Sequence, residues 1–256
     1  MHPILFTLGP IEVRFYGLMY VVAIVVGSYI IGREVKRKKL PLTPDNIMNF
    51  VVWCVIGGIV VARLYYVAFN WDFYSEYLVE IPAVWHGGLA IHGGVMGGFT
   101  AGWLYLNRTN VPFWKMADSV APALILGQAF GRFGNFMNGD AHGVPTTLPW
   151  GIVFPIESIA GNEFPGLATH PTMLYEMIIN ISIFLLIWFV LRKKDHKPGF
   201  IFTSYLVLYS AGRFFVEHFR ADSLVAGSLR AAQVASIILI VVAGFVIIRW
   251  RLWRRL

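Results

Sequence analysis

The sequence predicts an all-α integral membrane protein, a bundle of seven transmembrane helices with an outward-facing loop region over about residues 138–171. The chain is 57% hydrophobic and only 14% charged, whereas a soluble domain carries about 25% charged residues. Its mean hydropathy is +0.64, which also excludes a disordered chain. Since one span needs about 20 apolar residues, 256 residues hold about seven or eight spans. We therefore expect a single multi-pass membrane domain over residues 1–256.

Seven apolar segments along the chain are long enough to cross a bilayer. They cover residues 14–32, 46–68, 88–106, 115–137, 172–191, 199–219 and 230–249. The loops at 69–87 and 138–171 are rich in Trp and Tyr, which suits the interface between lipid and water. No internal repeat is evident, so the inverted-repeat pattern of many transporters is not seen.

The basic residues collect in four of the segments between spans. Residues 33–39, 108–115, 192–197 and 249–255 hold 15 of the 21 Lys and Arg, including every Lys. By the positive-inside rule this side is cytoplasmic, so the N-terminus lies outside and the C-terminus inside. The loops near 69–87, 138–171 and 220–229 then face outward. The net charge of +7 is explained by this placement, and nucleic-acid binding is not expected. Because basic residues follow the first span and do not precede it, we expect that span to be retained and not cleaved as a signal peptide.

Several classes of chemistry find no support in the sequence. Cys54 is the only cysteine, which excludes intramolecular disulfides, Cys-rich zinc sites and iron–sulfur clusters. The sequence shows no G-x-S-x-G, H-E-x-x-H or Walker motif, so serine hydrolase, zinc protease and nucleotide chemistry are disfavoured. We predict neither a metal nor a cofactor, and expect any chemistry to rest on Arg, His, Tyr, Asn and carboxylates.

Three arginines, Arg63, Arg132 and Arg213, lie within predicted spans. An arginine at the centre of a span costs about 2.5–3.5 kcal/mol, so each needs a partner or a function. All three lie past the middle of a span that runs outward, so we expect them at the same depth, towards the outer leaflet.

The sixth span places Tyr205, Tyr209, Arg213 and Glu217 at intervals of four, which puts them on one helical stripe. Arg213 and Glu217 can pair across one turn. One interpretation is a self-neutralising ion pair buried in the bundle. The other is that Arg213 offers its planar set of donors to an anionic head group while Glu217 holds it in place.

The fourth span ends in polar residues, with Gln128, Arg132 and Asn135 on one helical face. Asp140 follows, and glycines such as Gly143 allow the backbone to turn or a ligand to approach closely. These residues form either a capped helix end or a contact for phosphate or glycerol. The density of donors and acceptors favours the second interpretation.

The third span opens with His92 beside the glycine pairs Gly93/Gly97 and Gly94/Gly98, a spacing that brings helices into close contact. His92 is either a histidine satisfied at that helix interface or a general base near the outer face.

Two further spans begin with polar residues. Tyr16 and Tyr20 open the first, and His170, Tyr175 and Glu176 open the fifth. Alone, each set is explained as an aromatic belt or a helix start. Together with the other three, they give five spans with polar residues directed towards the outer leaflet.

These blocks resemble a known family, bacterial prolipoprotein diacylglyceryl transferase, in the family's order from about residue 3 to 250. The blocks are Phe15–Tyr20, Ile91–Gly94, Gly131–Asp140, His170–Glu176 and Tyr209–Glu217. The resemblance implies a seven-helix enzyme of the bacterial inner membrane. Its members move the diacylglyceryl group of phosphatidylglycerol to the thiol of a lipobox cysteine in the signal peptide of a prolipoprotein and release glycerol phosphate.

The resemblance also assigns roles by position. It implies that His92 is essential, that Arg132 and Arg213 handle the phosphate, and that the other polar site residues are Tyr16, Asn135, Tyr209 and Glu217. Asp140 departs from the Glu found in many members and is expected either to contact substrate or to set the loop. His86 also departs from the family pattern and receives no role.

The residues themselves suggest a compatible mechanism. A free thiol has a pKa of about 8.5, so it needs a base or a positive field to become a nucleophile. His92 is the candidate base, and Arg132 and Arg213 would stabilise the charge that grows on the leaving phosphate. Arg63 is a third candidate cation in the lining of the site.

Two other classes of protein remain possible at this stage. A transporter or flippase for an anionic lipid would use the same arginines without a covalent step. A purely structural membrane subunit would explain the glycine pairs but not the arginines. Formation of a thioether product separates the enzyme from both.

Overall fold

The computed structural model describes residues 3–9, 11–223, 225–226 and 229–254. The chain divides into two compact units, the first formed by Met1–Ile31 and Ala117–Leu256 and the second by Gly32–Met116. Arg255 of the last basic segment, and residues 224, 227 and 228 of the predicted outer loop, lie outside the described residues. The expected single domain over 1–256 stays a prediction.

Within the described residues, seven helices have 18 or more residues, and each corresponds to one of the predicted spans. They are α1 (Phe15–Arg37), α2 (Pro44–Phe69), α4 (Ile91–Thr109), α5 (Phe113–Asn138), α7 (Thr172–Phe189), α8 (Phe200–Glu217) and α9 (Ala231–Trp250). Among the described residues, four of them, α1, α2, α7 with its short extension, and α9, are long and apolar enough to cross a membrane. The chain is thus a largely helical membrane protein, and the crossing of all seven helices stays a prediction.

Short strands, helices and 3₁₀ turns lie before the first long helix and between the long helices. They are the strands β1 (Ile4–Leu8), β2 (Ile11–Arg14), β3 (Ile152–Val153), β4 (Ala168–Thr169), β5 (Val225–Ala226) and β6 (Leu229–Arg230), the helices α3 (Trp71–Glu76) and α6 (Ile159–Glu163), and the 3₁₀ turns η1 (Leu78–Glu80), η2 (Val84–His86) and η3 (Leu191–Lys193). The strands pair antiparallel as β1–β2, β3–β4 and β5–β6, each a separate two-stranded ribbon. Sequence periodicity is too weak to reveal two-residue strands.

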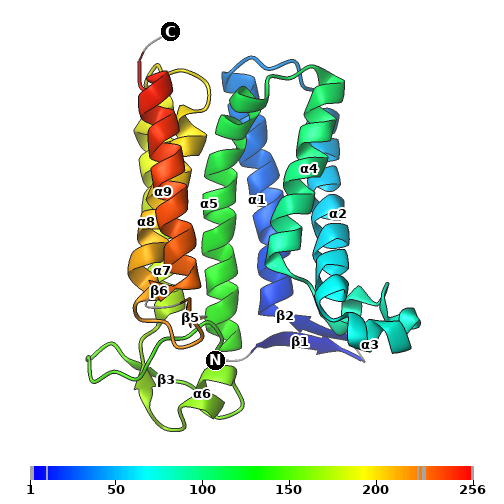
Figure 1. Cartoon of the computed structure of the whole chain (residues 1–256), viewed down its shortest axis with the longest axis vertical. Helices are drawn as coiled ribbons and strands as arrows, with labels where there is room; N and C mark the ends of the chain where they lie inside the picture. The colour runs from blue at the N-terminus through cyan, green and yellow to red at the C-terminus, as the bar shows by residue number, and fades with distance from the viewer. Residues whose placement is uncertain (1–2, 10, 224, 227–228, 255–256) are drawn as a thin grey trace. The chain divides into compact units, whose positions relative to one another are not determined.

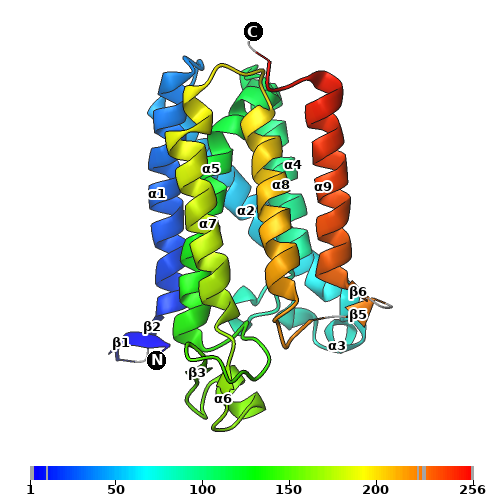
Figure 2. The ribbon, with the colours of Figure 1, turned by 90° about the vertical axis from the view of Figure 1, so that its left-hand side faces the viewer.

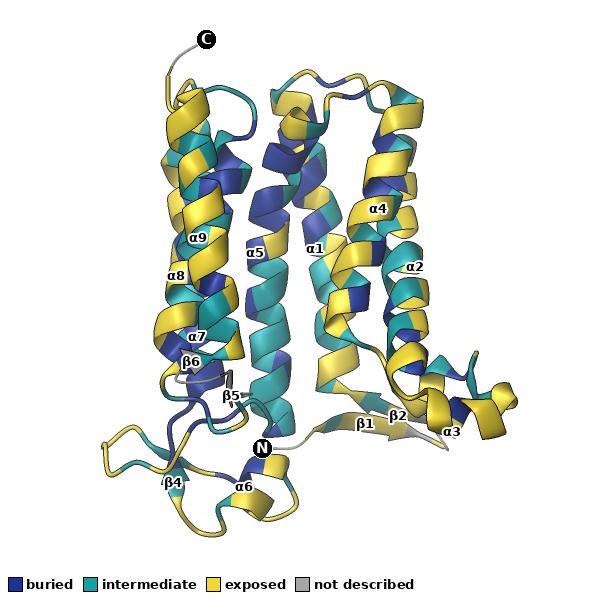
Figure 3. Cartoon of the chain, viewed as in Figure 1, coloured by how far each residue is buried: buried dark blue, intermediate teal, exposed yellow. Residues whose placement is uncertain are grey.

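In the first unit, α7 packs on α8 and α8 packs on α9 (Figures 1 and 2). The core between α5, α7 and α8 is apolar and consists of Ala121, Ile125, Ile183, Ile187, Ile201 and Tyr205. The outward face of α9 is mostly exposed (Figure 3), and only Ser236 and Ala243 of that helix are buried. Such an apolar, uncovered helix face is what contact with lipid requires.

The short strands and α6 of the first unit gather at one end of its helices, and the C-terminus lies at the other (Figures 1 and 2). At the C-terminal end two predicted basic segments meet, because Lys197 donates its backbone N–H to Leu252 O at 3.0 Å and its ammonium to Trp250 O at 3.3 Å. In the second unit the other two basic segments meet in the same way, since Lys38 Nζ lies 3.3 Å from Lys115 O. Each unit therefore has one end where basic residues collect.

A buried carboxylate fixes where α8 begins. Asp118 on α5 is 1% exposed and accepts hydrogen bonds from the backbone N–H groups of Gly199 and Phe202, both at 2.8 Å. These donors have no partner within α8 itself, so Asp118 caps the helix from a neighbouring element. The contact sets the register of α8 against α5, and with it the height of the polar residues on both helices.

In the second unit α2 and α4 approach closely along their glycines, which confirms the packing predicted for the third span. A Cβ atom added at Gly93 would lie 2.5 Å from Val61 O, and one at Gly97 would collide with Gly57 O. Cys54 lies beside the same contact, because its Sγ is 3.0 Å from where a Cβ of Gly102 would be. At Gly93 and Gly97 the two backbones leave no room for a side chain, whereas a Cβ at Gly94 would meet its nearest atoms at 3.8 and 3.9 Å, ordinary contact distances.

Candidate active site

Glu176 on α7 lies where three arginines of the first unit converge. Its side chain is only 3% exposed. Its Oε2 is 2.8 Å from Nε of Arg132, and its Oε1 is 2.5 Å from Nη1 of Arg213 and 3.1 Å from Nη1 of Arg220. The arginines come from α5, α8 and the segment after α8. A single buried carboxylate thus connects three parts of the unit.

Glu217 provides a second buried carboxylate, 2% exposed, at the end of α8. Its Oε2 lies 2.6 Å from Nη2 of Arg213, which confirms the ion pair predicted from their spacing. Arg220 is 4.0 Å from Glu217 and bonds Asp222 through Nη2 at 2.6 Å and Nε at 2.9 Å. Burial raises the pKa of Asp222, but the hydrogen bonds and charge of Arg220 outweigh burial and leave that pKa below its usual value.

The end of α5 extends this network through neutral amides. Arg132 donates from Nη1 to Asn135 Oδ1 at 3.2 Å, and Asn135 donates to Asp140 Oδ1 at 2.6 Å. Asn138 donates to the other oxygen of Asp140 at 2.8 Å. Asp140 therefore holds the turn at the end of the helix and orients Asn135 towards Arg132.

The arginines differ in what they can still bind. Arg220 is 8% exposed, and all three of its nitrogens already contact Glu176 or Asp222. Arg132 and Arg213 are 22% and 18% exposed. Among the described residues, Nη2 of Arg132 and Nε of Arg213 donate no hydrogen bond. These two arginines can each bind an anion without releasing their carboxylates.

Two predicted tyrosines lie on α1 and α8. Tyr16 on α1 exchanges a hydrogen bond with the hydroxyl of Tyr20 at 3.1 Å, and its ring fits against Gly134, where a Cβ would approach it to 2.9 Å. Tyr209 on α8 stacks on Tyr205, with ring centroids 6.0 Å apart. A role for Tyr16 or Tyr209 in substrate binding stays a prediction.

Gly143 secures the loop over residues 138–171 to the end of α8. Its N–H donates to His170 O at 2.9 Å, and it forms a backbone bridge with Arg220. A Cβ at this position would lie 2.6 Å from both His170 Cβ and Phe219 O, so only glycine fits. The structure thus gives Gly143 a clear packing role, and its predicted contact with substrate stays a prediction.

The loop is also held by hydrogen bonds through Tyr175. Trp150 can only donate, and it does so to the Tyr175 hydroxyl at 2.8 Å. That hydroxyl lies 3.1 Å from Nδ1 of His170, which is 8% exposed. Burial lowers the pKa of His170, which keeps the ring neutral and able to accept the Tyr175 proton at Nδ1.

Arg63 belongs to the second unit and is 4% exposed. Its Nε donates to Ile81 O at 2.8 Å, its Nη1 to Gly87 O at 2.6 Å, and its Nη2 to Glu80 O at 2.5 Å. The guanidinium also lies 5.0 Å from the ring of Tyr74. These contacts explain why an arginine occurs within a span: it fixes the loop after α2. Its predicted place in a substrate lining stays untested.

His92 also belongs to the second unit, at the first turn of α4. It is exposed, and its ring centroid is 6.3 Å from that of Tyr65 on α2. His92 is thus accessible at the end of the glycine contact between α2 and α4, as a general base requires, and its role as the base stays a prediction.

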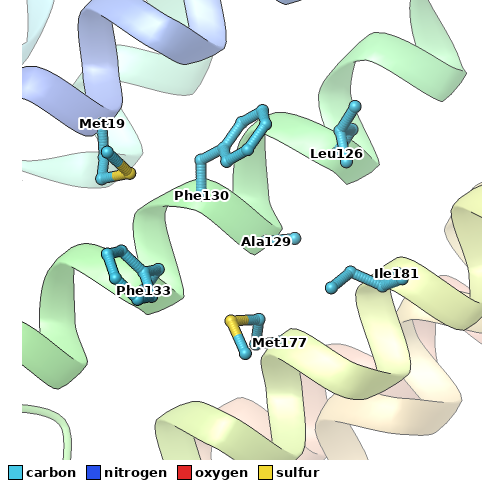
Figure 4. A pocket seen from close by; sticks show the side chains of 7 residues that line it. All are labelled: Met19, Leu126, Ala129, Phe130, Phe133, Met177 and Ile181. Carbon is cyan, nitrogen blue, oxygen red and sulfur yellow. The ribbon is translucent and has the colours of Figure 1, made fainter.

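An apolar cavity of about 300 Å³ lies in the first unit close to the arginines along the chain. Figure 4 shows the side chains around it, which come from α1, α5 and α7: Met19, Leu126, Ala129, Phe130, Phe133, Met177 and Ile181. Phe133 follows Arg132 in α5, and Met177 follows Glu176 in α7. Charged and apolar surfaces therefore adjoin on the same two helices.

Metal binding finds no support in the part of the chain that the structure describes, where no three His, Cys, Asp or Glu side chains are grouped to hold an ion.

Comparison with known proteins identifies the relatives of this chain. The family model described as prolipoprotein diacylglyceryl transferase matches residues 3–250. The chain belongs to the prolipoprotein diacylglyceryl transferase family. A phosphatidylglycerol–prolipoprotein diacylglyceryl transferase from Thermosynechococcus vestitus is 41% identical over 248 residues, which are 96% of this chain and 90% of that protein. One from Geobacillus kaustophilus is 44% identical over 97% of this chain and 93% of its own length.

Membership of the prolipoprotein diacylglyceryl transferase family confirms the resemblance drawn from the sequence blocks. The structure brings together five of the predicted site residues, namely Arg132, Asn135, Asp140, Arg213 and Glu217. Sequence reasoning gave no role to Glu176 or Arg220. The sequence pointed to Glu176 only because a carboxylate in the first turns of an otherwise apolar span is costly without a partner.

Proposed function

We propose that this protein transfers the diacylglyceryl group of phosphatidylglycerol to the thiol of the lipobox cysteine of a prolipoprotein. A thioether forms, and glycerol phosphate is released. The observation that carries the proposal is the pair Arg132 and Arg213, bound to one buried carboxylate and each with an unused N–H group. The names and high identity of the curated relatives support the same activity.

The proposed transfer reaction gives Arg132 and Arg213 a defined role. The thiolate sulfur attacks the glyceryl carbon that carries the phosphate, so a C–S bond forms and the C–O bond to phosphate breaks. The electron pair of that bond passes to the phosphate oxygen, and the thiol proton passes to a base. Arg132 and Arg213 stabilise the charge that grows on this oxygen, which is most effective in a site shielded from water.

His92 is the base in this proposal. It is accessible at the start of α4, and a neutral imidazole accepts a proton near physiological pH. Asn135, Tyr16 and Tyr209 bind the glycerol and phosphate oxygens, and Asp140 orients Asn135 through their hydrogen bond. Arg63 and Gly143 support this arrangement through the loops that they fix.

The apolar cavity suits an acyl chain of the same lipid. Its volume of about 300 Å³ is at the lower end for ligand pockets and holds part of a chain, while its apolar lining offers no partner to a charged head group. A chain in the cavity would leave the head group near Arg132, since Ala129 of the lining is one turn away on α5. No cofactor or metal is needed for this reaction.

We further propose that all seven helices cross the bacterial inner membrane, with the N-terminus and the 138–171 loop outside and the C-terminus in the cytoplasm. Cysteine labelling tests this, and replacing the single Cys54 with Ala gives a background without thiols. Residues near 36 and 194 should react only from the cytoplasm, and residues near 75 and 160 only from outside. The reverse pattern would place the site on the wrong leaflet for secreted precursors.

The activity is tested by mass spectrometry of a lipobox peptide incubated with the purified protein and phosphatidylglycerol. The expected product is heavier by one diacylglyceryl group on the cysteine. A peptide with Ser in place of that cysteine is the control and should stay unmodified. A transporter or flippase would leave both peptides unchanged, and that result would refute the proposed function.

A further inference from the structure

We infer that Glu176 is a positioning residue for the transfer reaction, holding Arg132 and Arg213 in the orientation that meets the phosphate. This inference rests on the proposed function. It assigns a task to a residue that the sequence blocks left without one, and it separates the role of Glu176 from that of Glu217.

The contacts of Glu176 fix the direction of two guanidinium groups at once. Its Oε2 meets Nε of Arg132 at 2.8 Å, and its Oε1 meets Nη1 of Arg213 at 2.5 Å. Since the guanidinium is planar, one such contact together with a second anchor sets the plane of the group. Asn135 is the second anchor of Arg132, and Glu217 is the second anchor of Arg213. Glu176 is the only residue among those described that contacts both arginines.

Arg132 and Arg213 each contact Glu176 through one nitrogen and keep an N–H group on another nitrogen for a ligand. Nη2 of Arg132 and Nε of Arg213 donate no hydrogen bond among the described residues, and both side chains stay about one-fifth exposed. Fixed donors that do not reorganise during the reaction are what stabilises a developing charge. The Glu176 carboxylate links the donor of Arg132 on α5 to the donor of Arg213 on α8.

Arg220 places a third positive charge beside Glu176. Its Nη1 lies 3.1 Å from Oε1 of Glu176, while its other nitrogens bind Asp222. At 8% exposure it is the least accessible of the three arginines. Arg220 therefore compensates the charge of Glu176 but is not itself placed to bind phosphate.

A simpler alternative is that Glu176 only balances the buried positive charge. The two roles differ in what should rescue its loss. Removing Glu176 alone leaves uncompensated arginines, which commonly destabilises a fold. Removing Glu176 and Arg220 together removes one negative and one positive charge, so charge balance is kept while the link between Arg132 and Arg213 is lost.

Three variants test this difference in the full-length protein: Glu176→Gln, Glu176→Asp and the double variant Glu176→Gln with Arg220→Gln. Each is assayed for folding in detergent and for kcat and KM with phosphatidylglycerol and a lipobox peptide. We expect kcat to fall about 10- to 100-fold in all three, the range found when residues that orient metal ligands are removed. KM for the lipid should change less than about threefold, because the arginines still attract an anionic head group. Glu157→Gln removes an exposed carboxylate of the same unit and is the control, with kcat unchanged.

The double variant and Glu176→Asp decide the question even if Glu176→Gln does not fold. The double variant should be more stable than Glu176→Gln yet remain slow, and Glu176→Asp should be slow although its charge is kept. Near-normal kcat in either of them would show that Glu176 only balances charge and would overturn the inference. If the wild-type protein formed no thioether at all, the proposed function itself would fail, which is a distinguishable result.

Discussion

Arg213 and Glu217 lie one turn apart on α8 and form an ion pair of 2.6 Å with the carboxylate 2% exposed. The pair occupies only one edge of the guanidinium. Glu217 of the same helix therefore holds Nη2 of Arg213, while Nη1 contacts Glu176 on α7. The buried ion pair, one of the two sequence interpretations, is confirmed, and the binding of an anionic head group by Arg213 stays a prediction.

Replacing Arg213 or Arg132 with Lys should reduce the transfer rate by about 30- to 500-fold. A lysine keeps the charge but lacks the planar set of donors whose direction Glu176 and the second anchor fix. Single-turnover rates with the lipobox peptide measure the effect. Arg14→Lys is the control, because Arg14 is exposed and pairs only with the nearby Glu12. Full rates in both site variants would refute the role of the arginines as a phosphate clamp.

Replacing His92 with Gln should lower the rate at neutral pH by about 100- to 10,000-fold, the usual range for loss of a general base. Gln keeps a polar side chain of similar reach but accepts no proton at this pH. Raising the pH increases the thiolate fraction of the peptide, so a variant that lacks only its base should recover part of its rate. The measurement is the pH–rate profile of a variant shown to fold in detergent. A near-normal rate at pH 7 would move the role of base to another group.

Replacing Arg63 with Met should lower stability by about 1–3 kcal/mol, because the carbonyl groups of the loop after α2 lose their shared donor. The melting temperature in detergent and the rate of proteolysis within residues 77–88 report this loss. Arg108→Met, an exposed arginine of the same unit, should leave both unchanged. A variant with normal stability but a raised KM for the lipid would instead favour a place for Arg63 in the substrate lining.

Replacing Gly143 with Ala should destabilise the loop over residues 138–171, since the new methyl group would lie 2.6 Å from His170 Cβ and Phe219 O. We expect a cost of about 1–3 kcal/mol, typical of overpacking. Thermal unfolding and limited proteolysis at residues 145–165 measure it. Gly244→Ala is the matched control, because no atom lies within 4 Å of its added Cβ. Equal stability of the two variants would mean that the loop has more space than its contacts indicate.

Acidification should destabilise the loop through His170. Burial lowers the pKa of His170 below its ordinary 6.5, so the unfolded state takes up the proton first as the pH falls. The contribution of neutral His170 is thus complete above about pH 6.5 and is lost as the pH falls below that value. Between pH 7.5 and 5.5 the wild-type melting temperature should therefore drop more than that of His170→Gln. His218→Gln, at an exposed histidine, serves as the control and should behave like the wild type.

The sequence predicted the long helices well because each needs a continuous apolar segment. Where the bounds differ, the cause is local. The first span was expected to end at residue 32, but α1 continues to Arg37, since Lys and Arg are good helix formers although they lower hydropathy. The third was expected to start at 88, but Gly87 and Gly88 have φ values of 89° and 72°, so α4 begins only at Ile91.

The site was harder to predict, for a physical reason. Helical periodicity reveals partners three or four residues apart, and it found the pair of Arg213 and Glu217. Glu176 meets arginines that are 37 and 44 residues away in the chain, and only the packing of α5, α7 and α8 brings them together. Likewise, no pattern in the sequence shows that Arg63 faces the carbonyl groups of its own loop.

The contact between α2 and α4 has a consequence for genetic studies of this protein. A library of random substitutions scored by cell growth should return Gly93 and Gly97 among the inactivating positions, next to His92 in the same helix. Substitutions at Gly93 and Gly97 would inactivate the protein through packing, since any larger residue pushes the backbones of α2 and α4 apart. Growth at lowered temperature should rescue some of these packing defects and none of the substitutions at His92. The first turns of α4 thus place a residue proposed for chemistry beside residues needed for assembly, and temperature tells them apart.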